Sequence, residues 1–239
     1  MRNVTTLTRR ELSVFFYSPI AYVVLAVFLG VTGAFFVKDN FLPGAEASLR
    51  ITFGYYLPVV LVFVMPLLTM RLLSEEFRGG TIETLMTAPV SDVDVILGKF
   101  LGTMVFYAVM LVATLLYVVL VWAYGPLDVG LVLCTYFGLI LLGALYVSVG
   151  LFFSACTRNQ VVAGLCTLVL LAVITLLANY LARDQEGIIR VLLQHVSVLA
   201  HFQDFARGLV DTNHLIFFVT TTACFLFLAV KVLESRRWR

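Results

Sequence analysis

The chain has 239 residues, of which 62% are hydrophobic and 13% are charged, and its mean hydropathy is +1.03. A soluble domain carries about a quarter charged residues, so this composition excludes an ordinary soluble enzyme and predicts an all-α integral membrane protein, one domain over 1–239. The formal net charge of +2 gives no indication of a nucleic-acid partner, and the 4 scattered cysteines fit no disulfide framework or metal site.

Residues 1–18 predict an amphipathic helix that lies in the membrane interface and ends at Pro19. Arg9 and Arg10 lie on its polar side, whereas Glu11 falls among the apolar residues, so we expect Glu11 to pair with a cationic group. A plain positively charged anchor explains the pattern equally well, and nothing in it resembles a cleaved signal peptide. The apolar side comprises Val4, Leu7, Leu12, Val14, Phe15 and Phe16.

Apolar runs long enough to cross a bilayer, which takes about 20 residues each, follow along the chain. Because lipid offers no hydrogen-bond partners to the backbone, each run is predicted to be a helix. The six predicted spans are 19–37, 51–70, 100–123, 129–153, 161–181 and 215–233.

The distribution of Lys and Arg predicts how the spans are oriented. Eleven of these residues fall on the side of the two termini and of the 71–99 loop, and five fall on the other side. Because cytoplasmic loops carry the excess of Lys and Arg, we expect both termini and this loop in the cytoplasm. The chain is then a multi-pass protein of the cytoplasmic (inner) membrane.

The loop contains the most polar long stretch of the chain, "RLLSEEFRGGTIETLMTAP", residues 71–89. Nothing in "RLLSEEF" breaks a helix, so the second span is predicted to continue through Phe77. Gly79 and Gly80 then end it, because glycine tolerates the left-handed conformation that follows many helices.

A second, short helix is predicted from 82 to 87, with Thr81 as its N-cap and Pro89 beyond its end. About two turns of helix are not stable alone, so its apolar face needs a cover. That face either folds back on this chain or enters a groove on a cytoplasmic partner, and the pattern alone favours neither. The apolar face consists of Ile82, Leu85 and Met86.

Two further capping patterns are predicted. Ser91 and Asp94 form a capping box for the helix that leads into the third span. The segment 182–214 is too long for a bare turn and predicts one or two short helices on the outer membrane face, with Gly208 as a stop. Asp211 or Thr212 then caps the last span, and packing is the default role of the segment beside that of a lid.

Several kinds of site are absent from the sequence. No Asp, Glu, Lys, Arg or His lies in the apolar body of a span, which disfavours an ion-coupled carrier or channel. Gly98-Lys99 is not a P-loop, because Phe100 follows it and Val93 stands where the first glycine belongs. The three histidines lie in the outer segment without a supporting ligand cluster, so neither a metal site nor catalytic residues are predicted.

Three stretches resemble a known family. "MRLLSEEFRGGTIETLMTAPVSDVDVILGKFLG" is similar to the signature loop of type-2 ABC exporter permeases, and "RRELSVFFYSPIAYVVLAVF" and "FARGLVDTNHLIFFV" resemble its gliding-motility branch. The resemblance implies a coupling helix with its approach, and an N-terminal connecting helix that includes Arg9, Arg10, Glu11 and Leu12. The implied coupling residues are Arg71, Glu75, Glu76, Arg78, Gly79, Gly80, Thr81, Ile82, Glu83, Thr84, Leu85, Met86 and Pro89.

The resemblance also implies how the protein works. The chain is then the permease subunit of an exporter, forms a dimer with a second copy or a paralogue, and binds no cofactor itself. Separate cytoplasmic ATPase subunits bind ATP and Mg, and a membrane-anchored accessory protein accompanies the gliding-motility branch. The alternatives are an ion-coupled carrier or channel, and a membrane scaffold for an ATPase-driven machine. The sequence does not name the substrate.

Overall fold

The computed structural model describes residues 2–40, 49–80, 91–124, 128–184 and 188–237, and every regular element within them is helical. Six of the described segments are long and apolar enough to cross a membrane, which confirms the all-α membrane class. They run through Pro19–Asn40, Leu49–Gly79, Asp92–Ala123, Val129–Cys156, Gln160–Ala182 and Thr212–Arg236.

The helices follow one another in the predicted order. The N-terminal helix α1 covers Arg2–Tyr17, and the first and third spans are α2 (Pro19–Asn40) and α7 (Asp92–Tyr124). The second span consists of α3 (Leu49–Ile51), the π-helical turn η1 (Thr52–Tyr56), α4 (Leu57–Thr69) and α5 (Ser74–Gly79). Then come α8 (Val129–Cys156), α9 (Gln160–Ala172), η2 (Val173–Leu177), α10 (Ala178–Asp184), α11 (Ile188–Val196), α12 (Val198–Ala206) and α13 (Thr212–Arg237).

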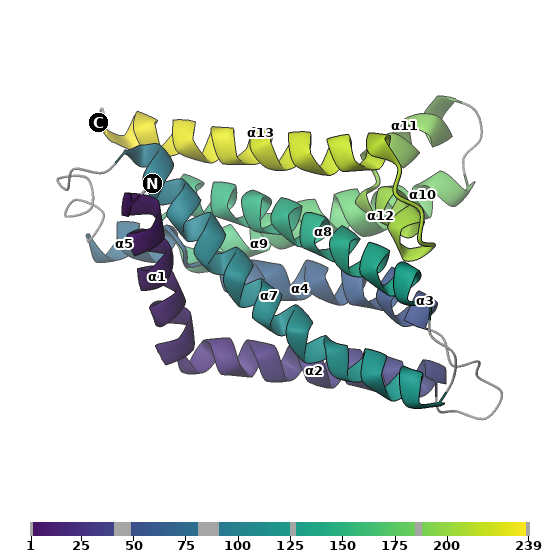
Figure 1. Ribbon diagram of the computed structural model, residues 1–239. Helices are drawn as coiled ribbons and strands as arrows, with labels where there is room; N and C mark the ends of the chain where they lie inside the picture. The colour runs from purple at the N-terminus through teal and green to yellow at the C-terminus, as the bar shows by residue number, and fades with distance from the viewer. Residues whose placement is uncertain (1, 41–48, 81–90, 125–127, 185–187, 238–239) are drawn as a thin grey trace.

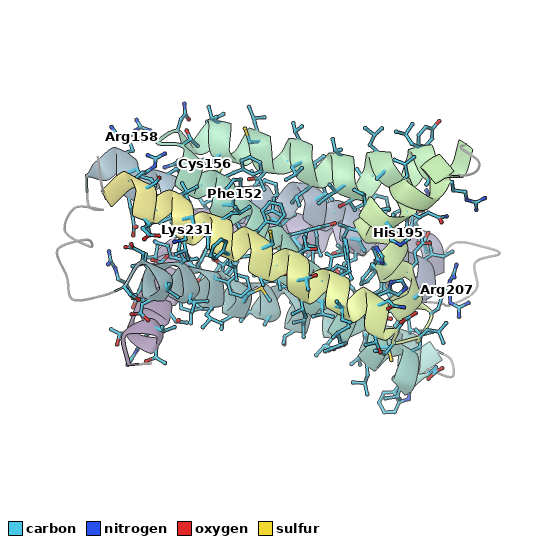
Figure 2. The ribbon with its side chains drawn as sticks, turned by 90° about the horizontal axis from the view of Figure 1, so that it is seen from above. Phe152, Cys156, Arg158, His195, Arg207 and Lys231 are labelled. Atoms are coloured by element: carbon cyan, nitrogen blue, oxygen red, sulfur yellow. The ribbon has the colours of Figure 1, made fainter. Side chains whose placement is uncertain are left out.

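Both termini lie at one end of the bundle, which we call the terminal end (Figure 1). Helices α1 and α5 lie there, and α1 crosses the bundle rather than running along it. The opposite, distal end carries α11 and α12. Figure 2 shows Arg158 and Lys231 near the terminal end and His195 and Arg207 near the distal end. The described ends of the spanning helices therefore alternate between the two ends of the bundle, as the six predicted spans require.

Helix α8 is the central element and packs against α4, α7, α9, α12 and α13. Gly138, Gly143 and Gly150 allow close approach, Gly138 to Phe205 of α12. A Cβ on Gly143 would lie 2.0 Å from the Tyr107 ring of α7, and one on Gly150 would lie 2.0 Å from Thr69 Oγ1 of α4. Small residues let helices pack closely in membranes, where van der Waals contact rather than water exclusion drives association.

The distal helices α11 and α12 confirm the short helices predicted between the last two spans. Gly208 has φ +81°, and the amides of Gly208 and Leu209 donate to Phe205 O and Asp204 O, which is a Schellman ending for α12. Asp211 caps α13 by accepting from the amide of Asn213 at 2.9 Å. The end of α12 and the start of α13 thus lie at Gly208 and Asp211, the residues that the sequence predicted.

The predicted continuous helix through 71–77 is wrong. Helix α4 ends at Thr69, residues 70–73 form a turn, and α5 starts at Ser74. No residue in the turn breaks a helix by itself. The turn is stabilised from outside, because Ser154 of α8 bonds to the backbone groups that a continuous helix would pair with each other.

The apolar stripe predicted for α1 is only partly packed against the other helices. Phe15 is buried, whereas Val14 and Phe16 are 54% and 43% exposed on the outside of the bundle. The face that packs on α7 contains Leu7, Glu11 and Phe15, which follow at four-residue spacing. The packed face is therefore one part of the predicted stripe.

Candidate functional site

Helix α1 is held against α7 by a pair of glycines. A Cβ on Gly98 would lie 2.6 Å from Leu7 Cβ, and one on Gly102 would lie 2.7 Å from Glu11 Cβ. The two glycines form a GxxxG motif, "GKFLG", which lets the helix backbones approach closely. This approach brings Glu11 beside Lys99, the residue that follows Gly98.

An ion triad joins three segments at this contact. Lys99 Nζ lies 2.9 Å from Glu11 Oε1 of α1 and 2.9 Å from Glu76 Oε1 of α5. The side chains of Lys99, Glu11 and Glu76 are 4%, 11% and 15% exposed, so solvent screens these pairs little. The predicted cationic partner of Glu11 is thereby confirmed.

One carboxylate oxygen of the triad has no described hydrogen-bond donor. Glu76 Oε2 is buried and has no hydrogen-bond partner among the residues that the structure describes. Two carboxylates share one ammonium, so the triad carries a net charge of −1 when all three groups are ionised. A cleft of about 180 Å³ adjoins it, lined in part by Arg10, Arg71 and Glu75. An N–H or cationic group from outside the described residues would satisfy the free oxygen.

Ser154 of α8 fastens the turn before α5. Its hydroxyl oxygen accepts from the amides of Leu73 and Ser74 at 3.0 and 3.1 Å and donates to Met70 O at 3.1 Å. The Ser74 hydroxyl also donates to Met70 O. One buried serine therefore replaces the intrahelical bonds lost between α4 and α5, and it fixes the start of α5 to the central helix.

The other end of α5 contacts the C-terminal helix. The Arg236 guanidinium lies over the Phe77 ring, 4.5 Å from its centroid, and donates to Cys156 O at the end of α8. Arg71 donates to the hydroxyl of Ser18, at the junction of α1 and α2, at 2.7 Å. Helix α5 and the turn before it are thus connected to α1, α7, α8 and α13.

The structure brings some of the predicted coupling residues together and leaves others apart. Glu76 and Arg71 make the contacts described above, whereas Glu75 and Arg78 are exposed. Gly79 ends α5, and Gly80 follows it with φ +70°, which confirms the predicted helix ending. Thr81, Ile82, Glu83, Thr84, Leu85, Met86 and Pro89, the predicted short coupling helix, lie outside the described residues.

The predicted connecting-helix residues differ in their surroundings. Arg9 and Arg10 are exposed, Leu12 is partly buried against the core, and only Glu11 belongs to the ion triad. Beyond residue 90 the capping box is confirmed, since the Asp94 amide donates to Ser91 Oγ at 3.1 Å and the Ser91 amide donates to Asp94 Oδ2 at 3.3 Å.

Sequence reasoning missed the roles of Lys99, Gly102 and Ser154. The GxxxG spacing was one signal for the α1–α7 contact, since it is typical of close helix packing. Lys99 was a second signal, because it lies at the start of a span, where a cation needs a partner. No signal in the sequence pointed to Ser154, whose partners are about 80 residues away along the chain.

A second polar cluster lies at the distal end. His201 Nε2 donates to His195 O at 3.0 Å, His201 Nδ1 lies 2.6 Å from His214 Nδ1, and His214 Nε2 lies 2.7 Å from Asp204 Oδ2. With Asp204 ionised, all three hydrogen bonds are made when the two rings carry three protons between them, so that one Nδ1 donates to the other. Burial lowers the pKa of His201, with a smaller contribution from the neighbouring His214.

The described residues contain no group of three or more His, Cys, Asp or Glu side chains arranged to hold a metal ion. In the distal cluster the facing nitrogens of His201 and His214 bond to each other.

The sequence matches the model of one protein family, the ABC-2 family transporter proteins, over residues 7–232. The chain belongs to the ABC-2 family. No curated protein matches it. An ABC-2 family membrane protein is the permease component of an ABC transporter, so this chain is a multi-pass membrane subunit of such a transporter. The ion triad and α5 lie within the part that matches the family.

The ion triad predicts a large effect of Lys99→Met on stability. The substitution leaves two buried carboxylates facing each other without a counter-ion, which costs about 3–5 kcal/mol. We expect a clear fall in the thermal unfolding temperature of the purified protein in detergent. Lys231→Met is the matched control, because Lys231 is exposed and its single pair with Glu234 contributes about 0–1 kcal/mol. Equal unfolding temperatures for the two variants would contradict the triad.

Ser154→Ala is predicted to destabilise the start of α5. It leaves the amides of Leu73 and Ser74 without an acceptor, at a cost of about 1–3 kcal/mol each. Amide hydrogen exchange of residues 70–79 should accelerate. Ser148→Ala is the control, since Ser148 is also buried on α8 but its hydroxyl donates only to Leu145 O of its own helix. If both variants exchange like the wild type, Ser154 does not fasten the turn.

The distal cluster predicts a pH effect on α12. Because the folded-state pKa of His201 is lowered, its neutral form stabilises the fold above the ordinary histidine pKa of about 6.5, and this contribution is lost as the pH falls. When both rings carry two protons, the hydrogen bond between His201 and His214 has no acceptor. We expect amides of 198–206, corrected for intrinsic rates, to exchange faster at about pH 5 than at about pH 7.5. His201→Gln should remove this difference; an unchanged difference would refute the assignment.

Proposed function

We propose that this chain is the transmembrane subunit of an ABC exporter of the gliding-motility type, and that separate ATPase subunits drive it through the segment 81–90. The observation that carries the proposal is the set of contacts of α5, the helix directly before that segment. Lys99 links α5 to α1 and α7, Ser154 links its start to α8, and Arg236 links it to α13. A force applied at residues 81–90 would reach these four helices through contacts of α5.

The distribution of charge supports the orientation that the proposal needs. Eleven of the sixteen Lys and Arg residues belong to segments at the terminal end, which corresponds to a cytoplasmic face. ATP is available on that face, and the chain has no P-loop to use it. In this proposal the ATPases bind ATP and Mg, both termini are in the cytoplasm, and the bilayer is the inner membrane.

Burial along the spans supports ATP as the energy source rather than an ion gradient. Among the described residues the buried acidic and basic side chains are Glu11 of α1 and Lys99 near the start of α7, and both of these helix segments lie at the terminal end. Coupling ions generally require an intramembrane ionisable group.

The buried Glu76 Oε2 also supports docking at this end. Its missing hydrogen-bond partner would come from the segment 81–90 or from the ATPase, which makes the triad sensitive to the position of the coupling segment. Two permease copies, with spans that move against each other, complete the exporter, and a membrane-anchored accessory protein accompanies it.

The test is copurification with the ATPase encoded beside this chain. Leu85→Asp places a charge on the apolar face predicted for the coupling helix, and we expect at least about tenfold less ATPase to copurify, as for an interface hot spot. Leu85→Met should retain the ATPase.

The matched control is Leu209→Asp, the same substitution at a leucine that is 61% exposed at the distal end. This variant should bind the ATPase as the wild type does. Undiminished copurification with Leu85→Asp would show that the ATPase docks elsewhere.

A further inference from the structure

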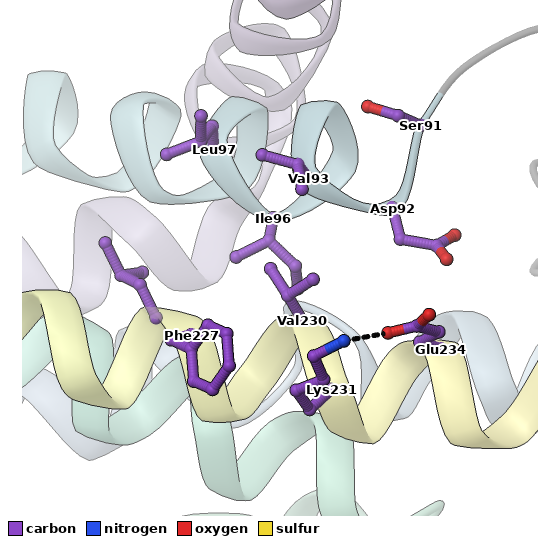
Figure 3. A pocket seen from close by; sticks show the side chains of 10 residues that line it. Ser91, Asp92, Val93, Ile96, Leu97, Phe227, Val230, Lys231 and Glu234 are labelled. Atoms are coloured by element: carbon purple, nitrogen blue, oxygen red, sulfur yellow. Dashed lines mark hydrogen bonds and ion pairs between the residues drawn. The ribbon is translucent and has the colours of Figure 1, made fainter.

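A groove of about 570 Å³ lies between the start of α7 and the end of α13 (Figure 3). It opens at the terminal end, on the outside of the bundle, where Phe227 is 60% exposed and Val93 is 48% exposed. Its lining residues are Ser91, Asp92, Val93, Ile96, Leu97, Leu226, Phe227, Val230, Lys231 and Glu234.

The side chains on the α13 wall of the groove change in character along the helix. Phe227, Lys231 and Glu234 are spaced by four and three residues, so they lie on one face of the helix and succeed one another by about 6 and about 4.5 Å along its axis. Going toward the terminal end, the wall therefore changes from an aromatic ring to an ammonium and then to a carboxylate.

The α7 wall changes in the same direction. Helix α7 begins at the terminal end and α13 finishes there, so the two helices run antiparallel past the groove (Figure 1). The apolar Leu97 and Ile96 lie deeper along α7, and Asp92, its first residue, lies at the mouth (Figure 3). Among the described lining residues, the mouth thus carries the ammonium of Lys231 and the carboxylates of Glu234 and Asp92, and the floor is apolar.

We infer that this groove binds a phospholipid whose headgroup carries both a phosphate and an ammonium, as in phosphatidylethanolamine. The acyl chains lie along Phe227 and Leu97, the phosphate contacts Lys231, and the ammonium contacts Glu234. The sequence of apolar, anionic and cationic parts in such a lipid complements the sequence of apolar, cationic and anionic groups on the walls.

The existing ion pair in the groove does not oppose this binding. Lys231 Nζ lies 2.7 Å from Glu234 Oε2, but the two side chains are 55% and 43% exposed, and such pairs contribute little. The headgroup dipole aligns antiparallel to this pair, so that Lys231 and Glu234 stay paired with each other while they contact the phosphate and the ammonium. A lipid with a net negative charge gains from Lys231 alone and is repelled by the carboxylate of Glu234. The inference requires only that the chain lies in a bilayer and is independent of ATPase docking.

The test uses tryptophan fluorescence of the full chain in vesicles of equal parts phosphatidylethanolamine and phosphatidylglycerol. Trp122 and Trp238 are replaced by phenylalanine, and Phe227→Trp provides one reporter in the groove. Either lipid carries brominated acyl chains, which quench tryptophan on contact, while the overall composition stays constant. Leu228→Trp is the matched reporter, because Leu228 is also exposed on α13 but does not line the groove.

We expect brominated phosphatidylethanolamine to quench the groove reporter with about fivefold higher relative affinity than brominated phosphatidylglycerol, and no preference at Leu228→Trp. Glu234→Gln should reduce this preference, and Lys231→Gln should weaken association of both lipids at the groove.

Three results would overturn the inference. Equal quenching by both lipids at both reporters would mean that ordinary annular lipid fills the groove. A preference for phosphatidylglycerol would mean that the carboxylate of Glu234 plays no part in recognition. Quenching at Leu228→Trp without quenching at Phe227→Trp would mean that protein, from this chain or a partner, occupies the groove.

Discussion

The buried ammonium of Lys99 is the interaction on which the terminal end depends. It lies between the carboxylates of Glu11 and Glu76, and it thereby holds α1 and α5 against the first turns of α7. A buried charge is stable only when it is paired, so removing Lys99 leaves both carboxylates uncompensated, whereas removing either carboxylate leaves Lys99 paired with the other. The position of α5 therefore depends on the positions of α1 and α7, to which the triad joins it.

The same arrangement explains why α5 is separate from α4. A continuous helix would satisfy its own backbone groups and would pass movement only along its axis. Ser154 instead supplies the hydrogen bonds of the turn from α8, so that α5 is fixed at its start by the central helix and along its length by Lys99 and Arg236. Such an element responds as a unit to whatever contacts the residues after Gly80.

Much of the fold follows from local chemistry. The apolar runs predict the six spans because hydrocarbon forces the backbone into helices, and Gly80, Gly208, Asp211 and the Ser91–Asp94 pair mark helix ends through conformation and capping. The candidate site was predictable in part. The need of Glu11 for a cation was visible because Glu11 falls among apolar residues of its helix, whereas Glu76 was indicated by the family resemblance.

The sequence by itself determined that the chain crosses a membrane, where the helices with capping or glycine signals end, and that it lacks a P-loop, since these depend on composition and on neighbouring residues. Only the tertiary structure decided that Lys99 is the partner of Glu11, that Ser154 interrupts the second span, and that Phe15 rather than Val14 faces inward. These outcomes depend on which helices lie side by side. That arrangement is set by the close approach of Gly98 and Gly102 to α1 and of α8 to its neighbours, contacts between residues far apart along the chain.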